Sequence, residues 1–275
     1  MDVQSGFAAI NGAKIYYEMA GDGQPLVMIH AGVADHRQWN NEFAHFAESY
    51  RVLRYDLRGY GKSELVEGEF SHMEDLVALL DYLNLRQPLV LVGCSMGGGL
   101  AMDFALSHPT RAKALIMVGS GPSGLELDVP TPPKFAEAEK AYEARDWDLL
   151  AELGVEIWFD GMNRTPDQVN SEARKLALEM IRLALVHEAK GIGKRLPDVE
   201  TSAAERLIQL NIPVLVVVGE HDVPYILAAA DYMVDHIPSV GKAMIKDAAH
   251  LPNMDHPAEF QRLMTVFLGE VDSKP

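Results

Sequence analysis

The sequence has 275 residues, 48% of them hydrophobic, so the chain is long and apolar enough to bury a full core. Its 40 acidic residues outnumber 24 lysines and arginines, and the net charge of −16 repels phosphate backbones and anionic headgroups, so we expect neither nucleic acid nor a membrane as partner. A single cysteine, Cys94, leaves no internal disulfide, and no apolar run approaches the roughly 18 residues of a spanning helix. We therefore expect a cytoplasmic protein that is not exported.

Short apolar runs alternate with helical patterns along most of the chain. A hairpin is expected around Asn11 and Gly12, which form a strong tight-turn signal. A helix is expected from Ser71 to Leu83, with a capping box of Ser71 and Glu74. Six apolar runs predict further strands, at 25–30, 50–56, 88–95, 114–121, 212–222 and 242–250, and a closing helix follows at 256–270. Strands that alternate with helices predict an α/β protein with a mostly parallel central sheet flanked by helices.

The alternation stops in the segment 122–210. Two charged stretches there, 134–159 and 171–190, favour helices, and we expect no strand in this part of the chain. The chain is therefore divided into a core of residues 1–121 and 211–275 and a helical cap inserted at 122–210. Such an insertion either covers the carboxyl edge of the sheet, where open α/β sheets bind ligands, or forms a helical subdomain with no contact to any site.

An apolar strand ends in one hydroxyl and a run of glycines in the stretch LVLVGCSMGGGL, Leu89 to Leu100. A glycine inside a helix costs about 1 kcal/mol relative to alanine, so three in succession indicate a turn too tight for side chains. Gly93 to Gly97 fits the pattern G-x-S-x-G between a buried strand and a helix, which places Ser95 on a strained turn. The alternative is a plain glycine-rich turn with a solvated serine.

A serine hydroxyl is a weak nucleophile at neutral pH and needs a histidine base with a carboxylate that orients the base. Asp222 and His250 each follow a predicted strand, so we expect both at the sheet edge that carries Ser95. The chain order Ser95, Asp222, His250 is the order expected of this architecture, and we expect these three residues to be catalytic. Glu220, two residues before Asp222, is the rival carboxylate.

Acyl transfer also needs backbone donors aimed at the developing oxyanion. The amide of Met96, directly after the serine, is one expected donor, and Gly32 supplies the other, with Val33 as the near alternative. His30 is expected to be buried and structural. The expected substrate-binding residues are Val33, Trp39, Trp158, Val223 and Leu251. In the insertion, four residues either line an apolar acyl pocket or form core: Trp158, Phe159, Met162 and Met180.

Motifs for other ligands fail on spacing. The stretch GYGKS, residues 59–63, contains the Gly-Lys-Ser of a phosphate-binding loop, but Asp56 occupies the position of its first glycine. His187 lacks a second histidine one helical turn later, because Gly191 stands there. We expect no cofactor and no metal.

Taken together, five stretches resemble the α/β-hydrolase fold superfamily over nearly the whole chain: HAG before Trp39, YDLRGYGKS, GCSMGG, GEHD and AAHLPNMDHP. The resemblance implies Ser95 as nucleophile, Asp222 as acid and His250 as base, with oxyanion donors from Gly32 and Met96. It also implies a cap between the sixth and seventh strands of the sheet. The usual His-Gly pair of the family is replaced here by a His-Ala pair at 30–31.

The expected function is hydrolysis of small carboxylic esters through an acyl-enzyme, as in a carboxylesterase. A serine rather than an aspartate at the turn argues against the dehalogenases and epoxide hydrolases of the superfamily. Lactonases, enol-lactonases and carbon–carbon bond hydrolases share the same triad and remain alternatives. A receptor-like ligand-binding protein with residual hydrolase activity is the alternative of another class. The expected partner is a small-molecule ester or lactone, and the sequence leaves the oligomeric state open.

Overall fold

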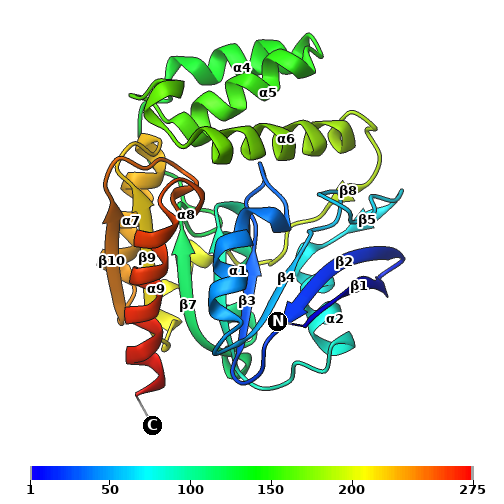
Figure 1. Ribbon diagram of the computed structural model, residues 1–275, viewed down its shortest axis with the longest axis vertical. Helices are drawn as coiled ribbons and strands as arrows, with labels where there is room; N and C mark the ends of the chain where they lie inside the picture. The colour runs from blue at the N-terminus through cyan, green and yellow to red at the C-terminus, as the bar shows by residue number, and fades with distance from the viewer. Residues whose placement is uncertain (1, 274–275) are drawn as a thin grey trace.

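A computed structural model describes residues 2–273. Within this range, eight strands form one sheet in the order β1-β2-β4-β3-β6-β7-β9-β10 (Figure 1). The strands are β1 Val3–Ile10, β2 Ala13–Ala20, β3 Pro25–Ile29, β4 Arg51–Tyr55, β6 Leu89–Cys94, β7 Ala112–Val118, β9 Val214–Gly219 and β10 Val240–Ile245. β2 pairs antiparallel with β1 and β4, and the other neighbours pair parallel. The expected α/β class with a mostly parallel sheet is confirmed.

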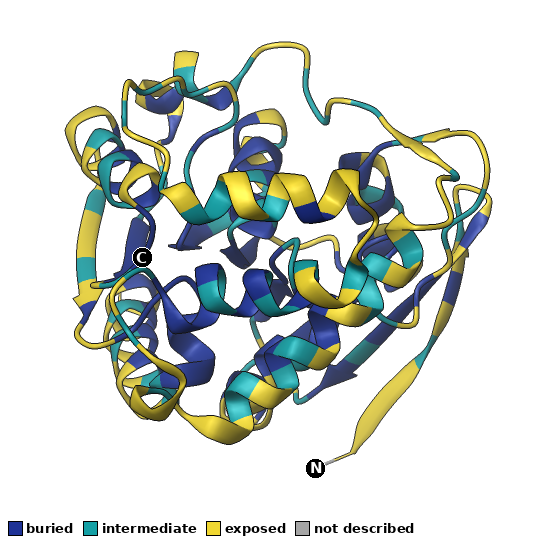
Figure 2. Cartoon of the chain, turned by 90° about the horizontal axis from the view of Figure 1, so that it is seen from above, coloured by how far each residue is buried: buried dark blue, intermediate teal, exposed yellow. Residues whose placement is uncertain are grey.

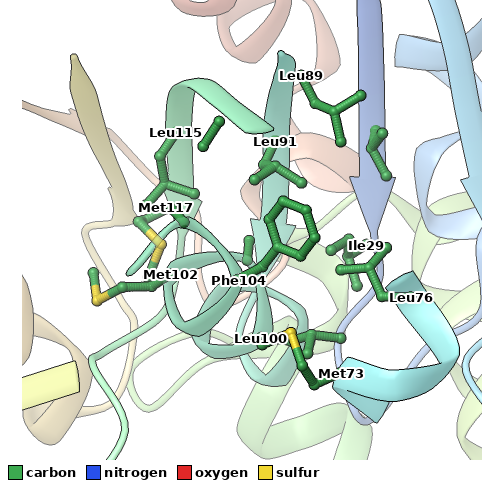
Figure 3. Close-up of a cluster of buried hydrophobic side chains, with 14 of the residues drawn as sticks. Ile29, Met73, Leu76, Leu89, Leu91, Leu100, Met102, Phe104, Leu115 and Met117 are labelled. Carbon is green, nitrogen blue, oxygen red and sulfur yellow. The ribbon is translucent and has the colours of Figure 1, made fainter. Parts of the chain in front are cut away.

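Helices cover both faces of this sheet. One face carries α2 His72–Tyr82, α3 Met96–Ser107 and α7 Pro224–His236, and the other carries α1 Asn40–Phe46 and α9 Pro257–Asp272. On β6, Leu89 and Leu91 pack toward the first set of helices, and Val90 and Val92 pack toward the second. Figure 3 shows the first core, in which Phe104 of α3 lies among strand side chains. Burial on both faces explains why the strands are continuously apolar in sequence.

The segment between β7 and β9 is mostly helical and lies beyond the carboxyl ends of the strands. Its helices are α4 Pro133–Glu143, α5 Trp147–Val155 and α6 Ser171–Glu188, which Figure 1 shows grouped beyond the tip of β7. The helix-favouring stretch 134–159 is divided into α4 and α5 because Arg145 has a left-handed backbone, with φ of 54°, and the Asp146 side chain then caps α5. Shorter helical turns are α8 Pro252–Asp255, His36–Trp39, Pro109–Arg111, Glu156–Asp160, Pro166–Gln168, Ala203–Glu205 and Leu207–Gln209.

The expectation of no strand between residues 122 and 210 is wrong. β8, Lys194–Arg195, pairs parallel with β5, Glu69–Phe70, in a second sheet of two strands. Asp198 continues this contact, because its Oδ1 accepts hydrogen bonds from Ser71 Oγ at 3.2 Å and from the Met73 amide at 3.1 Å. A strand of two residues is too short to show a period in sequence. The end of the insertion is therefore fastened to the start of α2.

The start of α2 is capped partly as expected. Ser71 Oγ accepts hydrogen bonds from the amides of Met73 and Glu74, at 3.1 and 3.3 Å. Within residues 2–273, no hydrogen bond from the Ser71 amide to the Glu74 side chain completes the capping box. Asp198, which comes from the insertion, supplies the additional acceptor instead.

Exposure separates the outer hairpin from the central strands. Figure 2 shows β1 mostly exposed beside the N-terminus, whereas the central strands are buried.

Of the helices in the described part of the chain, none is both long enough and apolar enough to cross a membrane.

A buried ion pair holds the N-terminal hairpin to α2. Arg58 donates to both carboxylate oxygens of Asp75, at 2.8 and 2.7 Å, and the two side chains are only 2% and 3% exposed. Arg58 Nη2 also donates to the carbonyl of Asn11, whose own side-chain amide donates to Asp75 at 3.0 Å. The tight turn at Asn11 is thus anchored from inside the protein.

Replacing Asp75 by alanine leaves the Arg58 guanidinium buried and without a counterion. We predict that Asp75→Ala lowers the free energy of unfolding by about 3–5 kcal/mol, measured by urea unfolding. Asp81→Ala on the same helix is the control, because Asp81 is 55% exposed and pairs with Arg111 at the surface. Its expected cost is below about 1 kcal/mol, and equal losses in the two variants would contradict the prediction.

Candidate active site

Ser95 joins β6 to α3 in a strained conformation, with φ of 51° and ψ of −116°. A left-handed backbone of this kind costs a residue other than glycine about 1–3 kcal/mol. Surrounding hydrogen bonds hold it: the Ser95 amide donates to the Val118 carbonyl at 2.9 Å, and the Ser120 hydroxyl donates to the Ser95 carbonyl at 2.7 Å. The amides of Gly98 and Gly99 donate to the same carbonyl, each at 3.0 Å. The turn expected from the sequence is therefore present and fixed from both sides.

The glycine after this turn is required by the neighbouring strand. A Cβ at Gly97 would lie 2.5 Å from the backbone oxygens of Ile29 and His30, at the end of β3. Backbone atoms inside a sheet cannot move aside as the tip of a flexible side chain can. α3 therefore starts at a distance from β3 that only glycine allows at position 97.

Asp222 and His250 meet beyond the ends of β9 and β10. The Nδ1 atom of His250 lies 2.9 and 3.1 Å from the two carboxylate oxygens of Asp222, and the residues are 1% and 4% exposed. The Val223 amide also donates to Asp222 Oδ1 at 2.8 Å. The rival Glu220 is exposed, and its carboxylate accepts a hydrogen bond from the Asp247 amide at 3.1 Å. Asp222, and not Glu220, lies against the histidine.

This pair lies against the same strand ends that hold Ser95. Gly119, which follows β7 with φ of 51°, has no room for a side chain, because a Cβ would lie 3.1 Å from His250 Nδ1 and 3.2 Å from Asp222 Oδ2. The Sγ atom of Cys94, directly before Ser95, donates to the His250 carbonyl at 3.6 Å. Burial raises the pKa of the Cys94 thiol to about 12. The structure thus brings the three residues expected to be catalytic into one region, beside an un-ionised thiol.

The residues expected to bind an oxyanion are neighbours. A Cβ built on Gly32 would lie 3.6 Å from Cε of Met96. Among residues 2–273, the amides of Gly32 and Val33 donate to no protein acceptor, whereas the Ala31 amide donates to Gln38 Oε1 at 2.9 Å. Met96 is the first residue of α3, so its amide precedes the intrahelical hydrogen bonds. The choice between Gly32 and Val33 stays a prediction.

His30 fixes the loop that carries these amides. The Leu57 amide donates to His30 Nε2 at 2.9 Å, so the ring proton is on Nδ1, which donates to the Ala31 carbonyl at 2.8 Å. Burial lowers the pKa of His30, which keeps the ring neutral. Because both ring nitrogens are occupied within the protein, His30 has the structural role expected of it.

A buried polar network connects this loop to the loop of His250. Asn253 Nδ2 donates to the Gln38 carbonyl at 2.9 Å and to Glu42 Oε2 at 3.1 Å, and Gln38 in turn accepts the Ala31 amide. Burial raises the pKa of Glu42 to about 8, so its carboxyl is uncharged at neutral pH. Sequence reasoning missed these residues because they match no motif. Gln38 and Glu42 stand in the mostly polar stretch HRQWNNE, residues 36–42, so no signal in the sequence marks them as buried.

The Glu42 carboxyl makes stability depend on pH. In the unfolded chain it ionises near its ordinary pKa of 4.5, whereas in the folded protein it stays protonated to about pH 8. Deprotonation therefore favours the unfolded chain between these values, so this group's contribution to stability is full below pH 4.5 and is lost as the pH rises toward 8.

We predict that Glu42→Gln, which stays neutral, removes this loss. From pH 5 to pH 8 the free energy of unfolding of the wild type should fall because Glu42 ionises more readily in the unfolded chain. In the variant this fall should be smaller by on the order of 3 kcal/mol. Urea unfolding at the two pH values measures the change. Glu48→Gln, at an exposed position near the same helix, is the control, and an equal effect of both substitutions would show that burial of Glu42 is not the cause.

A cavity of about 490 Å³ opens beside Ser95. Its walls come from α3, the loop after β7, the segment after β8 and the start of α7, and they include Ser95, Met96, Asp103, Arg195, Val199 and Tyr225. A second cavity of about 290 Å³ reaches Gly32 and is lined partly by α6, through Leu185 and His187. Arg195 borders both cavities. Sequence reasoning missed the segment after β8, because no pattern marks it as part of the site.

The five expected substrate-binding residues do not line the cavity beside Ser95. The expectation that Trp39 binds substrate is wrong. Its side chain is completely buried, packs on Phe260 with ring centroids 6.1 Å apart, and belongs to the core. Val223 and Leu251 are also buried, at 4% and 1% exposure, and belong to the hydrophobic cores on the two faces of the sheet. Val33 is half-buried on the oxyanion loop.

Trp158 is the expected pocket residue that contacts the site. Its ring lies over the His250 imidazole, with centroids 4.5 Å apart and the planes inclined by 46°. Trp158 is half-buried, whereas its neighbour Phe159 and Met180 of α6 are about 1% exposed and belong to the core of the insertion. The four aromatic and methionine residues singled out in the insertion therefore do not share one role.

Two groups of side chains within residues 2–273 have the spacing of a metal site: Asp35 with His36 and Asp56, and Glu220 with His221 and Asp247. In the first, the Asp56 carboxylate accepts the His36 amide and ring nitrogen at 2.7 Å and the Lys62 amide at 2.8 Å. Its oxygens are therefore occupied by hydrogen-bond donors of the protein. The second group lies at the surface.

Comparison with known proteins agrees with this architecture. Residues 24–257 match the family model of the alpha/beta hydrolase fold, so the chain belongs to that family. It is 28% identical over 258 residues to the pimeloyl-[acyl-carrier protein] methyl ester esterase of Aeromonas salmonicida, covering 93% of this chain and 100% of that protein. It is 28% identical over 272 residues to the 2-hydroxymuconate semialdehyde hydrolase of Pseudomonas sp. (strain CF600), covering 92% and 90%. The bromoperoxidase from Bacillus anthracis has a similar structure, with a TM-score of 0.78, 25% identity, and coverage of 98% and 100%.

Proposed function

We propose that this protein is a serine hydrolase that cleaves small carboxylic esters through an acyl-enzyme. The observation that carries the proposal is the buried Asp222–His250 pair beside a serine held at a φ of 51°. A strained backbone at that position persists only where the surroundings enforce it, and such strain is typical of functional sites. Membership of the family supports esterase-type hydrolysis, and one relative is a methyl ester esterase.

In the first half of the reaction, Nε2 of His250 takes the proton of the Ser95 hydroxyl as Oγ bonds to the ester carbonyl carbon. The Nδ1 proton of His250 stays hydrogen-bonded to Asp222, which stabilises the imidazolium that forms. Collapse of the tetrahedral intermediate breaks the carbon–oxygen bond to the alcohol. His250 then protonates the alcohol, and the acyl group remains on Ser95.

In the second half, water attacks the acyl-enzyme by the same route and the carboxylic acid is released. Both tetrahedral intermediates carry a negative oxygen that needs preorganised donors. The Met96 amide supplies one donor, and the amide of Gly32 or Val33 supplies the other. Trp158, whose ring lies against His250, limits the access of water to the imidazole.

Residues 122–210 act in this proposal as a cap on a core of residues 1–121 and 211–275. Two observations support the cap: α6 contributes to the cavity that reaches Gly32, and Trp158 contacts His250.

Carbon–carbon bond hydrolysis is the second candidate function. It is favoured by the similarity to 2-hydroxymuconate semialdehyde hydrolase, which has the same 28% identity to this chain as the esterase. Lactones are substrates of the same chemistry. In each case the reacting carbonyl occupies the cavity beside Ser95.

We predict that the wild type hydrolyses p-nitrophenyl acetate and butyrate, and that Ser95→Ala lowers kcat/KM by at least roughly 10³-fold, because no other group replaces the nucleophile. Initial rates on acetate, butyrate, octanoate and laurate esters measure this and report the preferred acyl length. Ser107→Ala, at an exposed serine in the last turn of α3, is the control and should keep its activity within about twofold. Absence of turnover in the wild type on every ester would refute an esterase and favour the carbon–carbon or binding alternatives.

The choice of carboxylate is tested separately. Asp222→Asn should lower kcat by on the order of 10³- to 10⁴-fold, because an amide in place of the carboxylate favours the wrong tautomer of His250. Glu220→Gln should change kcat by less than about threefold, since Glu220 is exposed and bonded to the Asp247 amide. Steady-state rates on p-nitrophenyl butyrate compare the two variants. A larger loss in Glu220→Gln would reverse the assignment.

A further inference from the structure

We propose that Asp103 binds a positively charged group at the end of the substrate far from the ester, so that the preferred substrates are esters with a terminal ammonium group. The inference rests on the proposed function, because it concerns the other end of the cavity that contains Ser95. A terminal ammonium group is a feature of the substrate that neither the turn at Ser95 nor the Asp222–His250 pair specifies.

One face of α3 connects Ser95 to Asp103. Ser95, Gly99 and Asp103 follow one another at intervals of four residues, and all three line the cavity of about 490 Å³. Gly99 and Asp103 share one face of α3 because they are four residues apart in the helix, and Ser95 directly precedes it, so eight residues at 1.5 Å each place Ser95 and Asp103 about 12 Å apart along the axis. Gly99, between them, leaves this face open: the atom nearest to a Cβ built there is the Gly121 carbonyl oxygen, 3.8 Å away.

The Asp103 carboxylate is buried, lines the cavity and forms no salt bridge among residues 2–273. The residue is 5% exposed, and its Oδ1 accepts one hydrogen bond, from Ser123 Oγ at 2.8 Å. Its Oδ2 has no partner among residues 2–273, and it is not one of the atoms fully sealed from solvent. Burial raises the pKa of Asp103 to about 6, so the group is desolvated but still ionised at neutral pH. A buried charge of this kind is stabilised by an opposite charge, which a ligand would supply.

The surrounding charges favour a cation at this position. Arg195 lines the cavity but is paired with Asp198, and Arg206, which lies near Asp103, donates to a backbone carbonyl of α3 at 2.7 Å. Neither guanidinium is hydrogen-bonded to Asp103. Together with Asp103, the carboxylates of Asp198 and Glu200 leave the lining with three acids against one base. The net charge of the chain, −16, acts in the same direction.

Three p-nitrophenyl esters of matched length test the proposal: 6-aminohexanoate, which ends in ammonium, heptanoate, which ends in methyl, and the monoester of heptanedioate, which ends in carboxylate. At pH 7.5 the wild type should prefer the ammonium ester to the methyl ester by roughly 10-fold or more in kcat/KM, as expected for a hydrogen bond between charged groups. The carboxylate ester should be the poorest substrate. In Asp103→Asn, which retains an acceptor for Ser123, the ammonium-to-methyl ratio should fall to near one.

The ammonium-to-methyl ratio should also depend on pH. If Asp103 had only a structural role, this ratio would stay constant as the pH changes. As the pH falls through about 6, Asp103 gains a proton and the preference of the wild type for the ammonium ester should fall. A pH effect on the shared chemical step changes both rates alike and cancels in the ratio. Glu126→Gln removes an exposed carboxylate outside the cavity lining and should leave the ratio unchanged within about threefold.

Equal use of the ammonium and methyl esters by the wild type would overturn the proposal, as would a preference that survives in Asp103→Asn. A preference for the carboxylate ester would overturn it in favour of Arg195 as an anchor for anions. If no ester is cleaved, the proposed function fails, and titration calorimetry with hexylammonium tests the site without turnover. Binding that is weakened at least about 10-fold by Asp103→Asn supports the site, and equal binding by both proteins overturns it.

Discussion

The close approach of α3 to β3 is the constraint on which the rest of the site depends. At Gly97 a single Cβ would overlap the backbone oxygens of Ile29 and His30, so the helix starts as near to the sheet as backbone sterics allow. The chain must then reverse within one residue, and Ser95 takes the left-handed conformation that results. The same contact sets the direction of α3, so it also fixes the face that carries Gly99 and Asp103 along the cavity.

Around this contact, neutral polar groups hold the loops of Gly32 and His250 in place. Burial lowers the pKa of His30 and raises that of Glu42, so both are uncharged where they bond to neighbouring backbone and side chains. Asn253 and Gln38 link the loop of His250 to the loop of Gly32 through direct hydrogen bonds. Neutral groups of this kind fix two loops without the cost of burying unpaired charge. Asp103 differs, because it is a buried carboxylate that forms no salt bridge within residues 2–273.

The strands were predictable because burial on both faces leaves continuous apolar runs, and observed ends differ from the expected ones by a few residues. That Ser95, Asp222 and His250 lie at one edge of the sheet was predictable because each follows a strand, and parallel strands end at one edge. The two-residue pairing of β5 with β8 was not visible, and neither was the break at Arg145. A single left-handed residue or one short ladder leaves too little pattern in a sequence to be recognised.

The sequence by itself determined the fold class, the turn at Ser95 and the candidate histidine and carboxylates for the same sheet edge, since these depend on local periodicity and on the order of residues along the chain. Only the tertiary structure decided that Asp222 and not Glu220 meets His250, that Trp39 belongs to the core, and that Asp103 and Arg195 border the cavity. Such contacts join residues that are far apart in the sequence. They depend on the direction in which each side chain leaves its helix or strand, which the packing of the whole chain sets.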